Sequence, residues 1–347
     1  MTDMKQKKNQ AYRRKITIKN TSIILAFSLL LLLSFLVSMN TGYSKLSPLD
    51  TLRTLFGGGS DRENLILFGF RLPRFVIAIL VGAGLSLSGC IIQGVSRNAL
   101  ADPGLLGINA GAGLTVILFV LFFHSQSILS ALTLPFLALI GAGLTAILIY
   151  ALAYKRQTGI APIRLILTGV AVQAGISALT TVLVIKLDDT QFDFVAAWQA
   201  GCIWGSNWKF VLALLPWLLL LIPYVLSKAR MLDVLSLGDD IACSLGASVE
   251  KERRRLLAAA VALAASCVAV SGSISFVGLI APHLARRLVG PGHRVLLPAC
   301  ALAGALLVSA SDTMARAIIQ PFEIPAGIMV AIVGAPYFLY LLARSKQ

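Results

Sequence analysis

The chain has 347 residues, of which 57% are hydrophobic and 13% are charged. Soluble domains carry roughly a quarter charged residues, so this composition excludes an ordinary soluble protein. The formal net charge of +15 does not favour a nucleic-acid-binding protein, because no globular basic segment exists to carry such a surface. Basic residues of a membrane protein instead hold its loops on the cytoplasmic side.

Apolar stretches long enough to cross a bilayer recur along the whole chain. Such spans must be helices, because lipid offers no partner for exposed backbone groups. We therefore expect an all-α polytopic membrane protein with about ten transmembrane helices. The expected spans cover residues 21–40, 72–95, 104–123, 132–154, 164–185, 208–226, 256–274, 276–289, 295–315 and 324–342. Residues 1–20 would form a basic tail, and residues 21–345 a single transmembrane domain.

The distribution of Lys and Arg orients these spans. Of the 30 Lys and Arg residues, 22 fall on the side of the N-terminus and 8 on the other side. Because cytoplasmic loops are enriched in Lys and Arg, we expect both termini inside the cell. The longest inner loop then covers residues 227–255.

A charged outer lip precedes the second span. Arg71 and Arg74 flank Pro73, and an uncharged run follows from Phe75 to Ser96. A polar break over residues 97–104 then turns the chain back into apolar sequence. This pattern predicts a membrane hairpin whose outer end carries two arginines.

The chemistry of an enzyme is missing. No GxxxxGK[ST] loop is present, and no His, Cys or acidic group has metal-ligand spacing, so we expect no nucleotide, cofactor or metal bound by this chain. An ion-coupled secondary carrier would need buried acids near the middle of the membrane. Asp312 is the best candidate for such an acid, but it lies four residues before Arg316, and a local ion pair explains it more simply.

The inner loop contains a candidate partner-binding helix. Asp239 and Asp240 begin a short helical pattern, Ile241 and Leu245 share one face, and Gly246 is placed as a C-cap. An amphipathic helix could lie on the bilayer, but anionic lipid would repel the two acids. The pattern therefore favours a protein partner with a hydrophobic groove.

Several motifs agree in order with one family of transporters. They are RLPR at 71–74, LVGAGLSLSG at 80–89, NALADPGLLG at 98–107, SLGDDIACSLG at 236–246, SISFVGLIAPHLAR at 273–286 and HRVLLP at 293–298. Over roughly residues 45–345 the chain resembles the permeases of type II ABC importers, which take up iron–siderophores, haem and cobalamin. It departs from the family's NPLADPG pattern at Ala99, where a proline is usual.

The resemblance implies a set of partners in the cytoplasmic membrane of a prokaryote. Two permeases, identical or different, would pair around a central pathway and sit on two ATPase subunits that bind ATP and Mg²⁺. An external substrate-binding protein would deliver the ligand. Arg71, Arg74 and Arg316 match the arginines that dock glutamates of that protein, and all three fall outside in the topology derived from charge.

The resemblance also implies the inner working parts. The coupling segment that fits the ATPase groove corresponds to Leu237, Gly238, Asp239, Asp240, Ala242, Leu245 and Gly246. The inner gate corresponds to Ala161, Pro162 and Ile163. Transport would proceed by alternating access. A ferric siderophore is the expected cargo, and haem or cobalamin remain alternatives.

Overall fold

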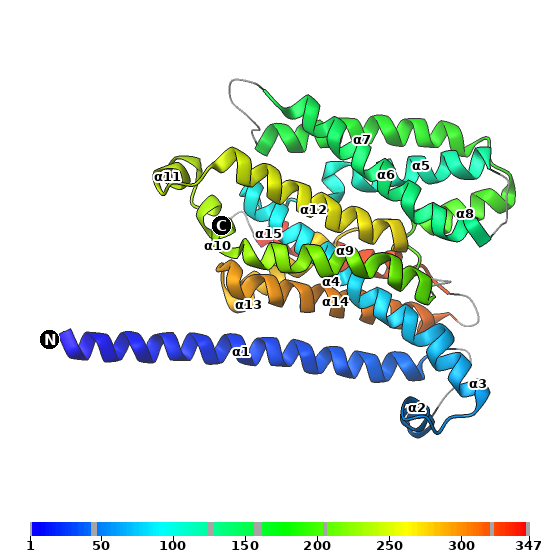
Figure 1. Cartoon of the computed structure of the whole chain (residues 1–347), viewed down its shortest axis with the longest axis horizontal. Helices are drawn as coiled ribbons and strands as arrows, with labels where there is room; N and C mark the ends of the chain where they lie inside the picture. Colours follow the sequence, from blue (N-terminus) through cyan, green and yellow to red (C-terminus); the bar gives the residue numbers. More distant parts are fainter. Residues whose placement is uncertain are drawn as a thin grey trace.

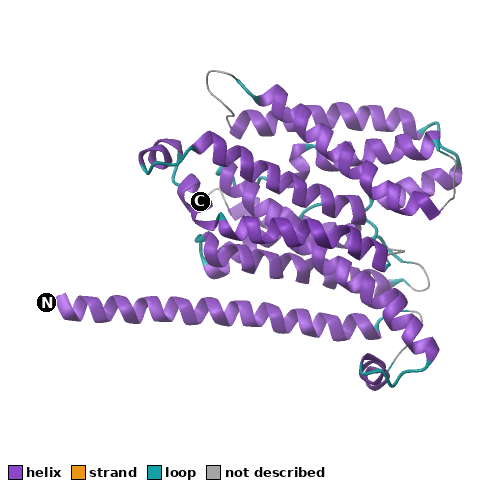
Figure 2. Cartoon of the chain, viewed as in Figure 1, coloured by secondary structure: helices purple, strands orange, loops and turns teal. Residues whose placement is uncertain are grey.

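The computed structural model describes residues 2–42, 47–123, 128–155, 162–203, 207–319 and 323–344. These residues fold mostly into helices joined by short turns (Figure 2). The all-α architecture expected from the apolar pattern is therefore confirmed.

Each of the ten expected spans coincides with a helix of the structure. They are α1 (Thr2–Asn40), α4 (Leu72–Ser96), α5 (Ile108–Phe122), α6 (Ile128–Ala153), α7 (Pro162–Val184), α9 (Trp208–Ser227), α12 (Val249–Ser271), α13 (Val277–Val289), α14 (His293–Ile318) and α15 (Ala326–Arg344). In the described part of the chain, seven helices are long and apolar enough to cross a membrane, and the α5 and α15 segments are shorter apolar helices. At 13 residues, α13 is too short to cross a bilayer alone.

Shorter helices lie between these spans. They are α2 (Pro48–Leu55), α3 (Asp61–Asn64), the π-helix η1 (Leu65–Arg71), the 3-10 helix η2 (Pro103–Leu106), α8 (Asp189–Gln199), α10 (Ala229–Ser236) and α11 (Asp239–Ser244). The helical run into α4 begins earlier than the expected residue 72, because Ser60 and Glu63 form a capping box that starts α3. From there the chain stays helical to Ser96.

The two ends of the bundle differ in what they carry. The chain termini, α10 and α11 lie at one end, and α2, α3 and α8 lie at the other (Figure 1). The end with the termini also holds the loops rich in Lys and Arg, so it is the cytoplasmic end by the positive-inside rule. The structure thus confirms that both termini lie on the same side.

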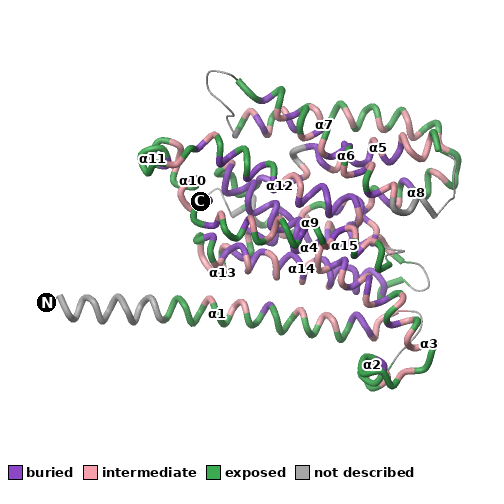
Figure 3. Tube along the Cα trace, in the orientation of Figure 1, coloured by how far each residue is buried: buried purple, intermediate pink, exposed green. Residues whose placement is uncertain are grey.

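The core of the bundle is built around α4. Of its most apolar stretch 83% is buried, against 17% for α1, which lies at the periphery (Figure 3). Helix α4 packs most extensively against α14, and also against α12 and α13. The inner helices are therefore shielded by the chain itself, whereas α1 presents most of its apolar surface outward.

The contact between α4 and α14 depends on two glycines. A methyl group on Gly82 would overlap the carbonyl of Gly304, and one on Gly304 would overlap the carbonyl of Gly82. One turn further along, the Ser86 hydroxyl donates a 2.7 Å hydrogen bond to the backbone oxygen of Cys300. Small residues allow such close approach of membrane helices, where no hydrophobic force drives them together.

Substituting valine for Gly304 is expected to separate these helices. The added side chain has no room, and overpacking of this kind costs about 1–3 kcal/mol or more. We expect Gly304→Val to lower the thermal unfolding midpoint of the purified chain in detergent. Gly143→Val on α6 is the matched control, because no atom lies within 4 Å of a Cβ built there. An unchanged midpoint for Gly304→Val would show that the helices are not held at this distance.

Candidate functional site

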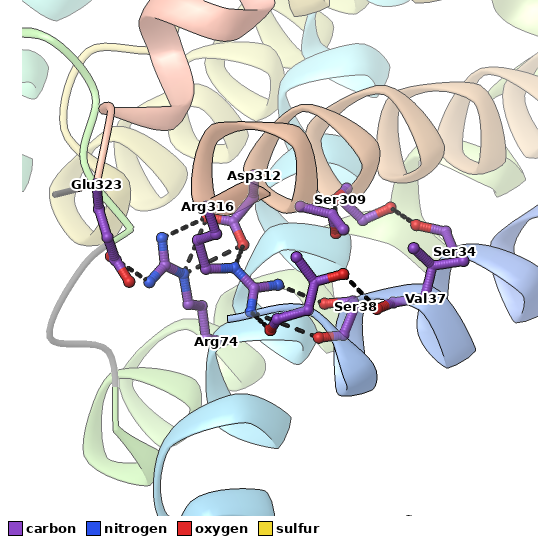
Figure 4. Close-up of polar contacts among 10 residues, drawn as sticks. Ser34, Val37, Ser38, Arg74, Ser309, Asp312, Arg316 and Glu323 are labelled. Atoms are coloured by element: carbon purple, nitrogen blue, oxygen red, sulfur yellow. Dashed lines mark hydrogen bonds and ion pairs between the residues drawn. The ribbon is translucent and has the colours of Figure 1, made fainter. Parts of the chain in front are cut away.

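Arg74 binds two carboxylates at the outer end of the bundle. Its Nε and Nη2 atoms lie 2.9 and 2.8 Å from Oδ1 of Asp312, and Nη1 lies 2.7 Å from Oε2 of Glu323 (Figure 4). Arg74 and Asp312 are in contact although they are 238 residues apart in the sequence. The contact joins α4 to α14 and to the segment before α15.

Arg316 joins α14 to the end of α1. Its Nη2 atom donates to Oγ of Ser38 at 2.6 Å, and Nη1 donates to the backbone oxygen of Thr41 at 3.1 Å (Figure 4). Its Nε atom also lies 3.3 Å from Oδ2 of Asp312. The expected local ion pair between Asp312 and Arg316 is confirmed. Because Asp312 is bound by two arginines and lies at the outer end of the bundle, it does not fit the acid of an ion-coupled carrier.

Arg71 also points to the end of α1, where its Nη1 atom donates to the backbone oxygen of Met39. The last carbonyls of a helix have no partner within that helix and form the negative end of its dipole. The carbonyl groups at the end of α1 therefore help to stabilise the buried guanidinium groups of Arg71 and Arg316. The sequence offered no sign that α1 supplies these acceptors, and it gave Glu323 no role.

The three arginines and two acids form one group, which we call the outer arginine cluster: Arg71, Arg74, Arg316, Asp312 and Glu323. It carries one formal positive charge in excess. Arg71 and Arg316 are 7% and 6% exposed, so they serve mainly the contacts within the chain. The part that solvent reaches is formed by the side chains of Arg74 and Glu323, which are 12% and 35% exposed. Arg74 is thus the arginine of the cluster that solvent reaches most, and it lies beside the more exposed Glu323.

At the opposite end, α11 presents an apolar surface to the cytoplasm. Leu237, Ile241 and Leu245 are 56%, 51% and 63% exposed, whereas Ala242 is fully buried against the body. Gly246 has a φ of +81°, and it donates to the backbone oxygen of Cys243 at 2.9 Å. The expected glycine cap is confirmed, in the left-handed conformation that glycine adopts without strain.

The acids at the start of α11 have different surroundings. Asp239 Oδ1 lies 2.7 Å from Nη2 of Arg253 on α12 and 3.4 Å from Nη2 of Arg97, the C-cap of α4. Asp240 is exposed. Gly238 precedes both acids with a φ of +111°, a conformation that other residues rarely adopt. The apolar knob formed by Leu237–Gly246 is therefore held to α4 and α12 by Asp239, with its leucines facing outward.

The expected inner gate is described only in part. Ala161 lies outside the described residues, and Pro162 begins α7. Ile163, the next residue, is 74% exposed. Its role at a gate stays a prediction, as do the docking and coupling roles. Among the residues that the structure describes, no group of three or more His, Cys, Asp and Glu side chains could hold a metal ion.

Comparison with known proteins identifies relatives along nearly the whole chain. The iron(3+)-hydroxamate import system permease protein FhuG of Bacillus subtilis is 51% identical over 322 residues, 92% of this chain and 95% of that protein. The iron-uptake system permease protein FeuC of the same bacterium is 44% identical over 93% of this chain and 97% of its own length.

A solved structure has the same fold. It is an inward-facing conformation of a metal-chelate type ABC transporter, with a TM-score of 0.81, 31% identity, and coverage of 94% of this chain and 99% of that chain. The profile described as the FecCD transport family matches residues 30–344. The chain therefore belongs to the FecCD transport family, and its fold is that of a type II ABC importer permease.

Proposed function

We propose that the chain is the permease subunit of an ABC importer that moves a ferric siderophore across the cytoplasmic membrane of a prokaryote by alternating access. The observation that carries this proposal is the exposed apolar knob of Leu237–Gly246 at the cytoplasmic end, in a chain with no nucleotide-binding loop. A transporter of this kind must take its energy from another subunit. Residues 1–20 act as a basic cytoplasmic tail and residues 21–345 as the permease domain.

The energy comes from two ATPase subunits that bind ATP and Mg²⁺. Exposed leucine and isoleucine side chains on a short helix suit a hydrophobic groove, and they are otherwise unfavourable in water. The acids that begin α11 lie at the positive end of its dipole, which stabilises the helix in water. ATP binding would move the groove and the knob together.

The outer arginine cluster docks an acidic surface of an external substrate-binding protein. Its excess positive charge attracts such a surface, and electrostatic complementarity speeds encounter as well as fixing orientation. Arg74 provides the direct contact by exchanging Glu323 for a carboxylate of the partner. Arg71 and Arg316 support this contact indirectly, because they hold the end of α1 in place.

A second permease, identical or different, completes the pathway. The outward face of α7 carries large exposed apolar residues: Ile163, Leu167, Val170, Leu179 and Val182. Such a face would be covered by lipid or by another permease. Of the proposed gate residues Ala161, Pro162 and Ile163, the last two begin the same helix, so pairing along α7 would bring two gates together.

Substituting charged residues for the apolar residues of the knob is expected to weaken binding of the ATPase. We expect Ile241→Asp with Leu245→Asp to weaken capture of the cognate ATPase subunit by about tenfold or more, because a groove that binds apolar side chains excludes carboxylates. Leu49→Asp on α2 is the matched control, since Leu49 is 80% exposed at the opposite end. Co-purification from detergent measures the effect. Full capture by the double variant would remove the coupling role from α11.

Removing Arg74, the least buried arginine of the outer arginine cluster, is expected to weaken docking. We expect Arg74→Gln to lower affinity for the cognate substrate-binding protein by at least about tenfold, because a partner carboxylate would lose its charged donor. The exposed Arg62 on α3 supplies a matched control, Arg62→Gln. Surface plasmon resonance on nanodiscs measures both affinities, with the unfolding midpoint as the check on folding. Equal affinities for the two variants would contradict the docking role.

The substrate assignment can be separated from the transporter class. In proteoliposomes containing the assembled importer, we expect uptake of a ferric hydroxamate siderophore to require ATP inside the compartment that holds the ATPase. Competition with haemin and cobalamin then ranks the alternatives. Uptake of haemin or cobalamin in place of the siderophore would change the cargo but not the class, whereas siderophore uptake without ATP would exclude an ABC importer.

A further inference from the structure

The N-terminus of α14 is capped by a side chain from α10, the helix that precedes the coupling segment. Oδ1 of Asp233, on α10, accepts from the backbone nitrogen of His293 at 2.9 Å and lies 2.7 Å from its ring Nδ1. The N-cap residue Gly292 has no side chain to do this. An acid at the start of a helix is stabilised by unpaired backbone N–H groups and by the helix dipole. Asp233 therefore binds α14 across 60 residues of sequence.

The same histidine touches α4. A Cβ built on Gly94 would lie 3.1 Å from Nε2 of His293 and 3.4 Å from Cδ2 of Leu232. The ring is only 3% exposed. The inner ends of α4 and α14 thus meet α10 at one packed point, which we call the inner junction: Gly94, Leu232, Asp233 and His293.

The coupling helix is attached to this junction from its other side. Asp239, the first residue of α11, lies within 3.4 Å of Arg97, which is three residues beyond Gly94 on α4. Arg253 on α12 binds the same oxygen at 2.7 Å. Only Leu237 and Gly238 separate α10 from α11. A shift of α4 and α14 would therefore reach α11 through two polar contacts and a short linker.

The outer ends of the same two helices carry the outer arginine cluster. Arg74 lies on α4, and Asp312 and Arg316 lie on α14. Between the ends, the backbones touch at Gly82 and Gly304. Asp312 lies nineteen positions after His293, so at about 1.5 Å per residue the two sites are about 28 Å apart along one helix. Closely packed helices have little freedom to deform between their ends.

We propose that Asp233 and His293 are positioning residues that let the α4–α14 pair transmit the state of the outer arginine cluster to the coupling helix α11. This inference deepens the proposed function and rests on it, because it assigns a route between the docking and coupling surfaces. The two helices move as one rigid unit. A change in the carboxylate that binds Arg74 shifts the outer end of this unit, and its inner end then changes the position of the knob.

A second ion pair at the inner end provides the contrast. Nζ of Lys228, at the start of α10, lies 2.7 Å from Oε2 of Glu252 on α12. The Lys228–Glu252 and Asp233–His293 contacts both hold α10, and both measure 2.7 Å. Helix α12 carries no residue of the outer arginine cluster, however, so the Lys228–Glu252 pair lies off the proposed route.

The chain contains a natural reporter on α11. Cys243 is exposed, whereas Cys90, Cys267 and Cys300 are buried. With Cys202 changed to serine, a nitroxide on Cys243 reports the mobility of the knob in the full chain in nanodiscs. We expect Asp312→Asn to change the label's spectrum, and Asp233→Ala to reduce that change at least threefold. Asp233→Asn, which keeps an acceptor for the His293 N–H group, should retain part of the response. If Asp233 had only a local structural role, the effects of the changes at Asp233 and at the distant Asp312 would be additive, and the response to Asp312→Asn would not depend on Asp233.

Two further variants distinguish the proposed route from a general loosening of the inner end. Lys228→Met should leave the response to Asp312→Asn intact, and Arg74→Gln serves as the outer change if Asp312→Asn does not fold. The proposal is overturned if neither outer change reaches the label, if Asp233→Ala leaves the response whole, or if Lys228→Met removes it equally. Capture of the cognate ATPase by the unaltered chain tests the proposed function separately.

Discussion

Gly82 and Gly304 bring the backbones of α4 and α14 into contact, and the features at both ends of this pair depend on that distance. At the outer end it lets the Arg74 guanidinium reach the Asp312 carboxylate at 2.8 Å. At the inner end it places the His293 ring against Gly94. Larger side chains at either glycine would move the helices apart and break both arrangements.

Charge is buried at the outer end only where it is compensated. The Asp312 carboxylate is bound by two arginines. Arg316 also donates to two backbone carbonyls and one hydroxyl group at the end of α1. Breaking such a buried pair by removing one partner costs about 3–5 kcal/mol, since the remaining charge is left without compensation. The cluster therefore serves the fold as well as any partner, and α1 is part of it although most of α1 lies at the periphery.

The two surfaces proposed to bind partners differ in the interaction that they offer, which is electrostatic at the outer end and hydrophobic at the cytoplasmic end. The outer cluster offers positive charge on side chains already held in place, which favours fast and oriented encounter with an acidic protein. The knob on α11 offers apolar side chains that water disfavours, which suits a lasting contact with a groove. Under the proposed function both kinds of contact are needed, because the cargo and the energy would reach the permease from opposite sides of the membrane.

Local pattern in the sequence predicted the features that depend on neighbours along the chain. The positions of the ten apolar helices follow from the apolar runs, the Asp312–Arg316 pair from i, i+4 spacing on a helix, and the Gly246 cap from the end of a short helical pattern. Only the tertiary structure decided which distant residues meet. Arg74 with Asp312, Arg316 with Ser38, and Asp233 with His293 are separated by 238, 278 and 60 residues. Membrane helices can pack in many orders with similar apolar surfaces, so no periodicity in one chain determines their neighbours.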